Sequence, residues 1–166
     1  MRASTIALAA ALAALSPTAV RADVVYTATN GPTCRNFSKS QVGDWICPGP
    51  GGYVARFSDE GNLASVTIGP GPRAKGRHPM QVLSAGKVFG DKIQWIVVDG
   101  VPRAAVLRMF HRADVNDDKE LQSLKVFLIE SGRTCLFGSI DARQPHANKT
   151  ALQRAELATR SDCTMK

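Results

Sequence analysis

Residues 92–111, KIQWIVVDGVPRAAVLRMFH, decide the fold that the sequence predicts. Residues 92–98 are rich in β-branched side chains and carry Trp95, a composition typical of a strand. The segment DGVP then turns the chain, and residues 104–111 run back as a second strand, because so short a connection permits only an antiparallel pair. The alternation of this second strand is imperfect, because four of its residues are apolar: Val106, Leu107, Met109 and Phe110.

Hairpins of the same kind lie on both sides of this pair. Residues 53–58 (YVARFS) alternate, with Tyr53, Ala55 and Phe57 on one face, and a turn separates them from a return strand. Downstream, Ser131-Gly132 separates another two strands. In all, strands are predicted at residues 23–29, 53–58, 63–68, 92–98, 104–111, 124–129 and 134–140. We expect four to six of them to form one antiparallel meander.

Two segments are rich in turn-forming residues instead. Residues 34–52 (CRNFSKSQVGDWICPGPGG) have weak periodicity, so we expect a loop held by a disulfide rather than by regular hydrogen bonds. Residues 69–80 (GPGPRAKGRHPM) contain three prolines and no periodic apolar pattern. They predict an exposed, irregular loop.

The end of the chain predicts a helix. Residues 147–163 contain no Gly or Pro, and a helical stripe is formed by Ala151, Leu152, Ala155, Ala158 and Thr159. This pattern indicates an amphipathic helix of about 15 residues whose alanines suit close packing on a sheet. The predicted fold class is α+β, an antiparallel β-meander with one C-terminal amphipathic helix and two disulfides.

The first 22 residues have the pattern of a cleaved signal peptide. Arg2 precedes the apolar run TIALAAALAAL of residues 5–15, which is shorter than the ~20 residues of a membrane span. We therefore expect residues 23–166 to form one disulfide-stapled domain that is exported, periplasmic or secreted. Without Arg2 and Arg21, 19 basic residues face 14 acidic ones, a net charge of +5. A solvated surface explains that charge, and neither a nucleic-acid-binding module nor a membrane span is predicted.

The four cysteines, Cys34, Cys47, Cys135 and Cys163, all lie in the predicted mature part. An even count in an exported chain favours two disulfides. Three connectivities are possible, and nearness in sequence favours Cys34–Cys47 and Cys135–Cys163. Zinc ligation is the alternative, but the sequence has no Cys-x-x-Cys and its histidines are isolated.

Two segments are candidates for contacts with a partner. The first carries Arg73, Lys75 and Arg77, whose cations suit an acidic protein face or an anionic envelope component. The alternative is a solvated loop that these charges only keep soluble. The second carries Trp45 and Tyr53 around a Gly/Pro run. Trp45 suits either an anchor in a partner's pocket or packing over the disulfide of its neighbour Cys47.

No catalytic, cofactor-binding or metal-binding residue is predicted. The sequence lacks the Gly-x-Ser-x-Gly and His-Glu-x-x-His motifs. Residues 114–118 (DVNDD) resemble the start of a calcium loop, but Lys119 and Lys125 stand where such a loop needs Gly and Glu. They indicate a polar hairpin connection instead.

Three stretches together resemble small exported bacterial proteins of unassigned function. They are Asp44-Trp45-Ile46-Cys47 leading to Gly51-Gly52-Tyr53-Val54, the return strand from Pro102 to Arg108, and the tail that carries Cys135 and Cys163 around an Ala-rich helix. The general build is also similar to periplasmic lysozyme inhibitors, although their Ser-Gly-x-x-Tyr loop is not matched.

Export, disulfides and the lack of a catalytic set favour a non-enzymatic, periplasmic or secreted binding or inhibitor-like module. The alternative is an envelope hydrolase or accessory enzyme, with His111 and Asp114 as its candidate pair.

Overall fold

The computed structural model describes residues 22–36, 43–71, 80–130 and 133–163, so the predicted signal peptide lies almost wholly outside the described residues. Ala22 is the first residue of β1. The strands are β1 (Ala22–Ala28), β2 (Arg35–Asn36), β3 (Gly43–Pro48), β4 (Tyr53–Asp59), β5 (Leu63–Pro70), β6 (Met80–Val98), β7 (Val101–Arg112), β8 (Leu121–Glu130) and β9 (Arg133–Asp141). A 3₁₀ turn, η1 (Pro50–Gly52), follows β3, and the helix α1 (Ala147–Ala158) follows β9.

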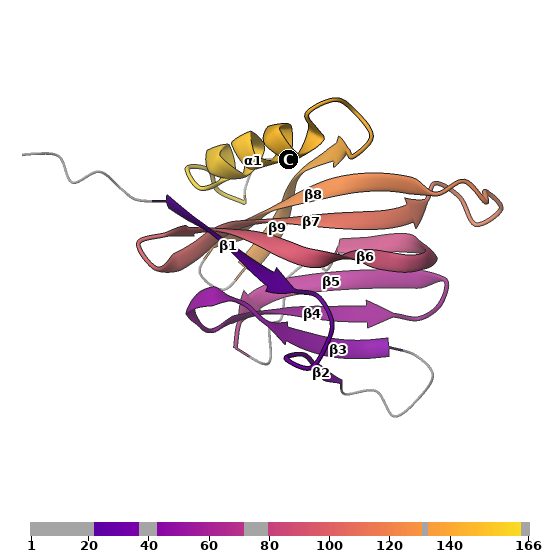
Figure 1. The fold of residues 1–166 in the computed structure, drawn as a ribbon, viewed down its shortest axis with the longest axis horizontal. Helices are drawn as coiled ribbons and strands as arrows, with labels where there is room; N and C mark the ends of the chain where they lie inside the picture. The colour runs from indigo at the N-terminus through magenta and orange to yellow at the C-terminus, as the bar shows by residue number, and fades with distance from the viewer. Residues whose placement is uncertain (1–21, 37–42, 72–79, 131–132, 164–166) are drawn as a thin grey trace, which may run out of the picture.

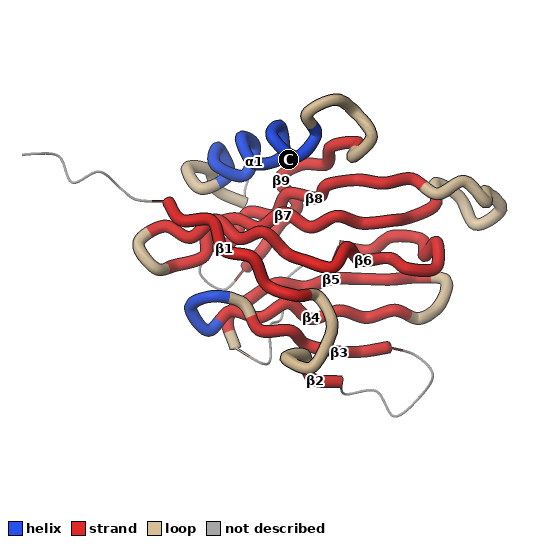
Figure 2. The backbone as a smooth tube through the Cα atoms, viewed as in Figure 1, coloured by secondary structure: helices blue, strands red, loops and turns tan. Residues whose placement is uncertain are grey.

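The strands form one antiparallel sheet. Strands β2 to β9 pair in sequence order, and β1 pairs with β6 beside this path. The sheet curls into a half-barrel, with α1 lying against one side of it (Figure 1). Figure 2 shows how much of the backbone is strand, with α1 as the long helical segment. The predicted antiparallel meander with a C-terminal helix is confirmed, but the described residues place nine strands in its sheet rather than four to six.

The inner face of the curled sheet carries the large side chains. They come from both halves of the chain and include Phe57, Val66, Ile68, Phe89, Ile93, Trp95, Leu107, Met109, Phe127 and Ile129. Phe57 stacks on Trp45 at a centroid distance of 5.3 Å and meets Phe89 edge-on at 4.8 Å. Strand β6 has register shifts between Ser84 and Phe89 and between Phe89 and Ile93. Bulges of this kind bend a strand, which brings β3–β5 over β6–β9.

The outer face is covered by α1, which packs on β7, β8 and β9. Its buried residues are all alanines: Ala147, Ala151, Ala155 and Ala158. They lie against apolar residues such as Val106, Val126 and Ile140. Gly138 of β9 lets the helix approach, because a Cβ there would lie 2.6 Å from Arg154 Cδ. Small residues on both sides therefore set a close helix–sheet distance.

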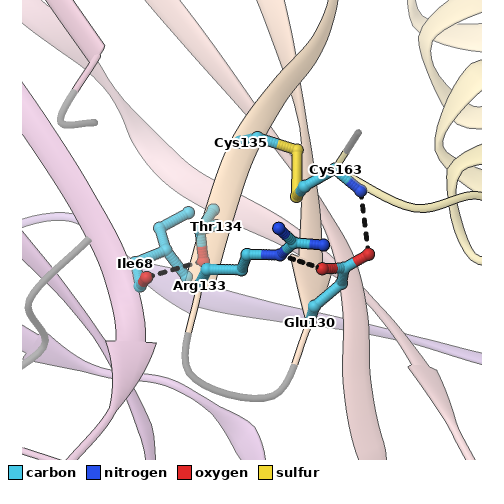
Figure 3. Close-up of a disulfide and its surroundings, with 6 residues drawn as sticks. All are labelled: Ile68, Glu130, Arg133, Thr134, Cys135 and Cys163. Atoms are coloured by element: carbon cyan, nitrogen blue, oxygen red, sulfur yellow. Dashed lines mark hydrogen bonds and ion pairs between the residues drawn. A yellow bond between two sulfur atoms is a disulfide. The ribbon is translucent and has the colours of Figure 1, made fainter. Parts of the chain in front are cut away.

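Side chains close the two open sides of the half-barrel. Trp45 Nε1 donates to the carbonyl oxygen of Thr29 at 2.7 Å, joining β3 to the end of β1. On the opposite side, Thr134 Oγ1 donates to the carbonyl oxygen of Ile68 at 2.7 Å, joining β9 to β5 (Figure 3). Single side-chain hydrogen bonds thus join β3 to β1 and β9 to β5, strand pairs that no backbone ladder connects.

Both predicted disulfides, Cys34–Cys47 and Cys135–Cys163, are confirmed. The second joins β9 to the chain beyond α1. Beside it, the Glu130 carboxylate accepts hydrogen bonds from Arg133 Nε and from the backbone N–H of Cys163 (Figure 3). These two bonds hold the pKa of Glu130 below its usual value. The tail after the helix is therefore fixed by the disulfide and by the hydrogen bond from the Cys163 N–H to the Glu130 carboxylate.

Several boundaries differ from the prediction. Strand β7 begins at Val101 rather than at residue 104, and β8 begins at Leu121 rather than at residue 124. The ends of the predicted loop 69–80 belong to β5, which runs to Pro70, and to β6, which begins at Met80. Within the predicted loop 34–52, residues 35–36 form β2. Residues 43–48, expected in a loop, form β3 and pair with β4, because Trp45 and Cys47 alternate inward beside Phe57 and Ala55. Strand β6 begins twelve residues before residue 92, at Met80, since its bulges hide the alternation of residues 80–91. The helix ends at Ala158, before Cys163, so it has 12 residues. No helix in the described part of the chain is long and apolar enough to cross a membrane.

Candidate functional site

A groove on the outer face lies where the cover of α1 ends. It consists of two hollows that share Lys92 and Arg108, and we call it the outer groove. One hollow is lined by Tyr26, Lys92, Gln94, Val106, Arg108, Leu124, Asn148 and Ala151. The other is lined by Lys87, Gly90, Asp91, Lys92, Arg108 and Phe110. Strand β1 and the start of α1 therefore form opposite sides of the groove.

The groove exists because α1 covers β7–β9 but not β1. On β1, Tyr26 is 59% exposed and Val24 is 43% exposed. In the hollow that Tyr26 lines, Val106 and Leu124 belong to the buried cluster under the helix and form an apolar floor. An aromatic wall and an apolar floor are typical of a binding surface.

The charged side chains of the groove are mostly cations. Arg108 donates to the amide oxygens of Gln122 at 3.3 Å and Asn148 at 3.5 Å, both neutral acceptors. Lys87 and Asp91 form an ion pair of 2.8 Å and offset each other's charge. Within the described ranges, no ion pair joins Lys92 or Arg108 to a carboxylate. The outer groove therefore carries two positive charges that no described acidic side chain neutralises.

Gly90 places Arg108 in the groove. A Cβ at Gly90 would lie 2.9 Å from Arg108 Cβ, closer than such atoms approach. The Gly90 carbonyl also accepts the hydroxyl of Thr29 at 2.6 Å, which fixes β1 beside β6. The cation thus stands on a rigid part of the sheet rather than on a loop.

A second polar group of side chains, which we call the Lys125 cluster, lies on the inner face of β7–β9 and consists of His111, Ser123, Lys125 and Ser139. Lys125 Nζ donates to Ser139 Oγ at 2.9 Å. His111 Nε2 lies 3.1 Å from Ser123 Oγ. Burial lowers the pKa of Lys125. The pKa of His111 is also lowered, chiefly by burial and further by the charge of Lys125.

The predicted contact residues fall in different places. Trp45 stacks on Phe57 and donates its indole N–H to the carbonyl oxygen of Thr29, so it packs against the inner core. Its predicted position over the Cys34–Cys47 disulfide stays a prediction. Tyr53 is half-buried against the inner core. Arg73, Lys75 and Arg77 lie outside the described residues.

The structure does not bring His111 and Asp114 together as a pair. The Asp114 carboxylate accepts the backbone N–H of Asn116 at 2.9 Å, and Asp117 likewise accepts that of Lys119. Such turns make residues 114–118 the polar connection between β7 and β8 that their composition predicts. His111 contacts Ser123 instead.

Sequence reasoning missed both Lys92 and Arg108. Arg108 alternates with Val106 and Phe110 on the outer side of β7, so a lone cation on an apolar face was the available signal. Among the described residues, no group of three or more His, Cys, Asp or Glu side chains could hold a metal ion. No family model, curated protein or solved structure matches the chain. The resemblance to small exported bacterial proteins therefore stays a prediction.

Proposed function

We propose that the chain is an exported, non-enzymatic binding module that holds an acidic protein face in the outer groove. The observation that carries this proposal is the pair of adjoining hollows that share Lys92 and Arg108. Two formed disulfides support an oxidising compartment. A periplasmic or secreted location is part of the proposal.

The charge balance of the groove favours an anionic partner. Arg108 is oriented by two amides and keeps N–H groups available for a carboxylate, which a guanidinium binds with two parallel hydrogen bonds. Lys92 adds a second cation at the border that the two hollows share. Opposite charge steers an acidic partner toward this side of the sheet.

The uncharged lining favours a protein over a polysaccharide or a lipid surface. Tyr26 offers a large, exposed ring, and tyrosine is enriched at protein interfaces. Gln94 and Asn148 offer amides that bind backbone groups, and Val106 and Leu124 offer apolar contact. An acidic protein segment can use all three kinds of contact at once.

Binding of a fluorescent peptide rich in Glu and Leu, measured by fluorescence anisotropy, tests the proposal. We expect Arg108→Gln and Lys92→Gln each to raise the Kd at least fivefold. The matched control is Arg103→Gln, which removes an exposed cation of β7 outside the groove and leaves the Kd unchanged. Affinity should also fall as salt is added.

Three other results would contradict the proposal. Equal losses in all three variants would show attraction by net charge alone. Anionic lipid vesicles or an acidic polysaccharide competing more strongly than the peptide would assign the groove to an envelope component. If only the combined reversal Arg73→Glu, Lys75→Glu and Arg77→Glu abolished binding, the contact would belong to residues 69–80.

A further inference from the structure

Lys125 is a buried cation whose ammonium group donates a hydrogen bond to a hydroxyl group. Lys125 is 8% exposed, and its Nζ donates to Ser139 Oγ across the β8–β9 ladder. In the described part of the chain, no carboxylate forms an ion pair with it. An ammonium group has three donors, and a buried charge is unfavourable unless an opposite charge lies beside it. Two donors of Lys125 therefore remain for an anion.

The neighbours of Lys125 contribute hydrogen-bonding groups but no negative charge. Ser123 stands two residues before Lys125 on the same face of β8, and its hydroxyl contacts His111 on β7. Burial and the nearby Lys125 disfavour the charged imidazolium of His111. The cluster thus carries one positive charge among two hydroxyls and an imidazole, which suits a ligand with one negative charge.

The cluster is open at the β9 side. Ser139 is exposed although its partner Lys125 is buried, because β9 ends the sheet. Leu136 pairs with Phe127, whose side chain belongs to the inner core, yet Leu136 is 45% exposed. An apolar side chain and a cation therefore lie on the same strand border, separated by the register shift between Val126 and Phe127.

We propose that the Lys125 cluster is a second binding site, distinct from the outer groove, for a ligand that carries a carboxylate next to an apolar group. The carboxylate accepts hydrogen bonds from Lys125 Nζ and Ser139 Oγ. The apolar group contacts Leu136. A charge-assisted bond in this sheltered place is stronger than the same bond between fully solvated groups.

A matched pair of small molecules tests the site. N-acetyl-leucine carries the carboxylate and the apolar side chain, whereas N-acetyl-leucinamide lacks only the charge. In NMR titrations of the full chain, we expect N-acetyl-leucine to shift the backbone amides of Ser123, Lys125 and Ser139. The amide should bind at least tenfold more weakly.

Two variants separate this site from the outer groove. Lys125→Met keeps the apolar stem, removes the charge, and should abolish the shifts. Lys92→Met removes a cation of the outer groove and should leave them unchanged, even if the acidic peptide no longer binds. Failure of one proposal is thus independent of failure of the other.

A third variant keeps the test decisive if Lys125→Met does not fold. Ser139→Asp replaces an exposed residue and places a carboxylate beside Lys125 Nζ, so it should block N-acetyl-leucine while the far-UV spectrum stays native. Equal binding of the two small molecules, or undiminished binding to the variants at Lys125 and Ser139, would overturn the proposal.

Discussion

The two faces of the same strands are covered in opposite ways. The inner face of β6 and β7 carries Trp95, Leu107 and Met109, which meet large side chains from β3–β5. The outer face carries Ala104 and Val106 and meets the alanines of α1. The inner core is thus filled by large side chains. The outer core consists of small side chains and depends on a short distance between helix and sheet.

This difference locates the candidate sites. The centre of the inner face is fully packed, with Trp95 and Leu107 both at 0% exposure. The centre of the outer face lies under α1. The polar groups of the two candidate sites lie where each cover ends, at the outer groove beside β1 and at the Lys125 cluster beside β9. Both proposed sites are therefore borders of a core rather than cavities within it.

The largest effect is expected from Trp95→Ala. This change leaves a large cavity in the inner core and should lower the free energy of unfolding by about 3–5 kcal/mol. It also removes the hydrogen bond from Trp95 Nε1 to Thr27 Oγ1 at 2.8 Å. Urea unfolding followed by circular dichroism measures the loss. Trp95→Phe, which keeps most of the volume, should cost less.

A smaller effect is expected from Ala155→Leu on the outer face. Ala155 is 0% exposed, so added methyl groups push α1 away from the sheet and should cost about 1–3 kcal/mol. The control is Leu157→Ala in the same helix, where a 62% exposed side chain should change stability by no more than about 0.5 kcal/mol. Should Ala155→Leu cost nothing, the outer core would not depend on a short helix–sheet distance.

The sequence predicts strands and their buried residues best where only one face of the strand is buried. Residues 53–58 alternate clearly, and Ala55 and Phe57 are indeed buried on β4. Strand β7 alternates poorly because Val106 is buried under α1 while Leu107 is buried in the inner core. Its consecutive apolar residues arise because both faces of the strand are buried, one under α1 and the other in the inner core. Burial on both faces is a property of the whole fold.

The candidate sites were beyond sequence reasoning for a different reason. Lys125 meets Ser139 only because the ladder of β8 and β9 shifts register at Val126 and Phe127. The outer groove depends on where α1 stops covering the sheet, and no residue pattern states that position. Local propensity predicts strands, but register and coverage arise from packing.

The smallest expected effect concerns the turn that leads from β9 to the outer helix. Arg143, mainly through its side-chain hydrogen bond, lowers the pKa of the exposed Asp141 to about 2 from its ordinary value of 3.8. A carboxyl group with a lowered pKa stabilises the fold above its unfolded pKa, and this contribution is lost as the pH falls from about 4 to about 2. In Arg143→Gln, NMR titration should return the Asp141 pKa toward its ordinary value. The stability of this variant should then fall less steeply than that of the unchanged chain within that pH window. An unchanged Asp141 pKa in Arg143→Gln would mean that the backbone N–H of residue 143, which donates to the Asp141 carboxylate at 3.0 Å, keeps the pKa low without the ion pair.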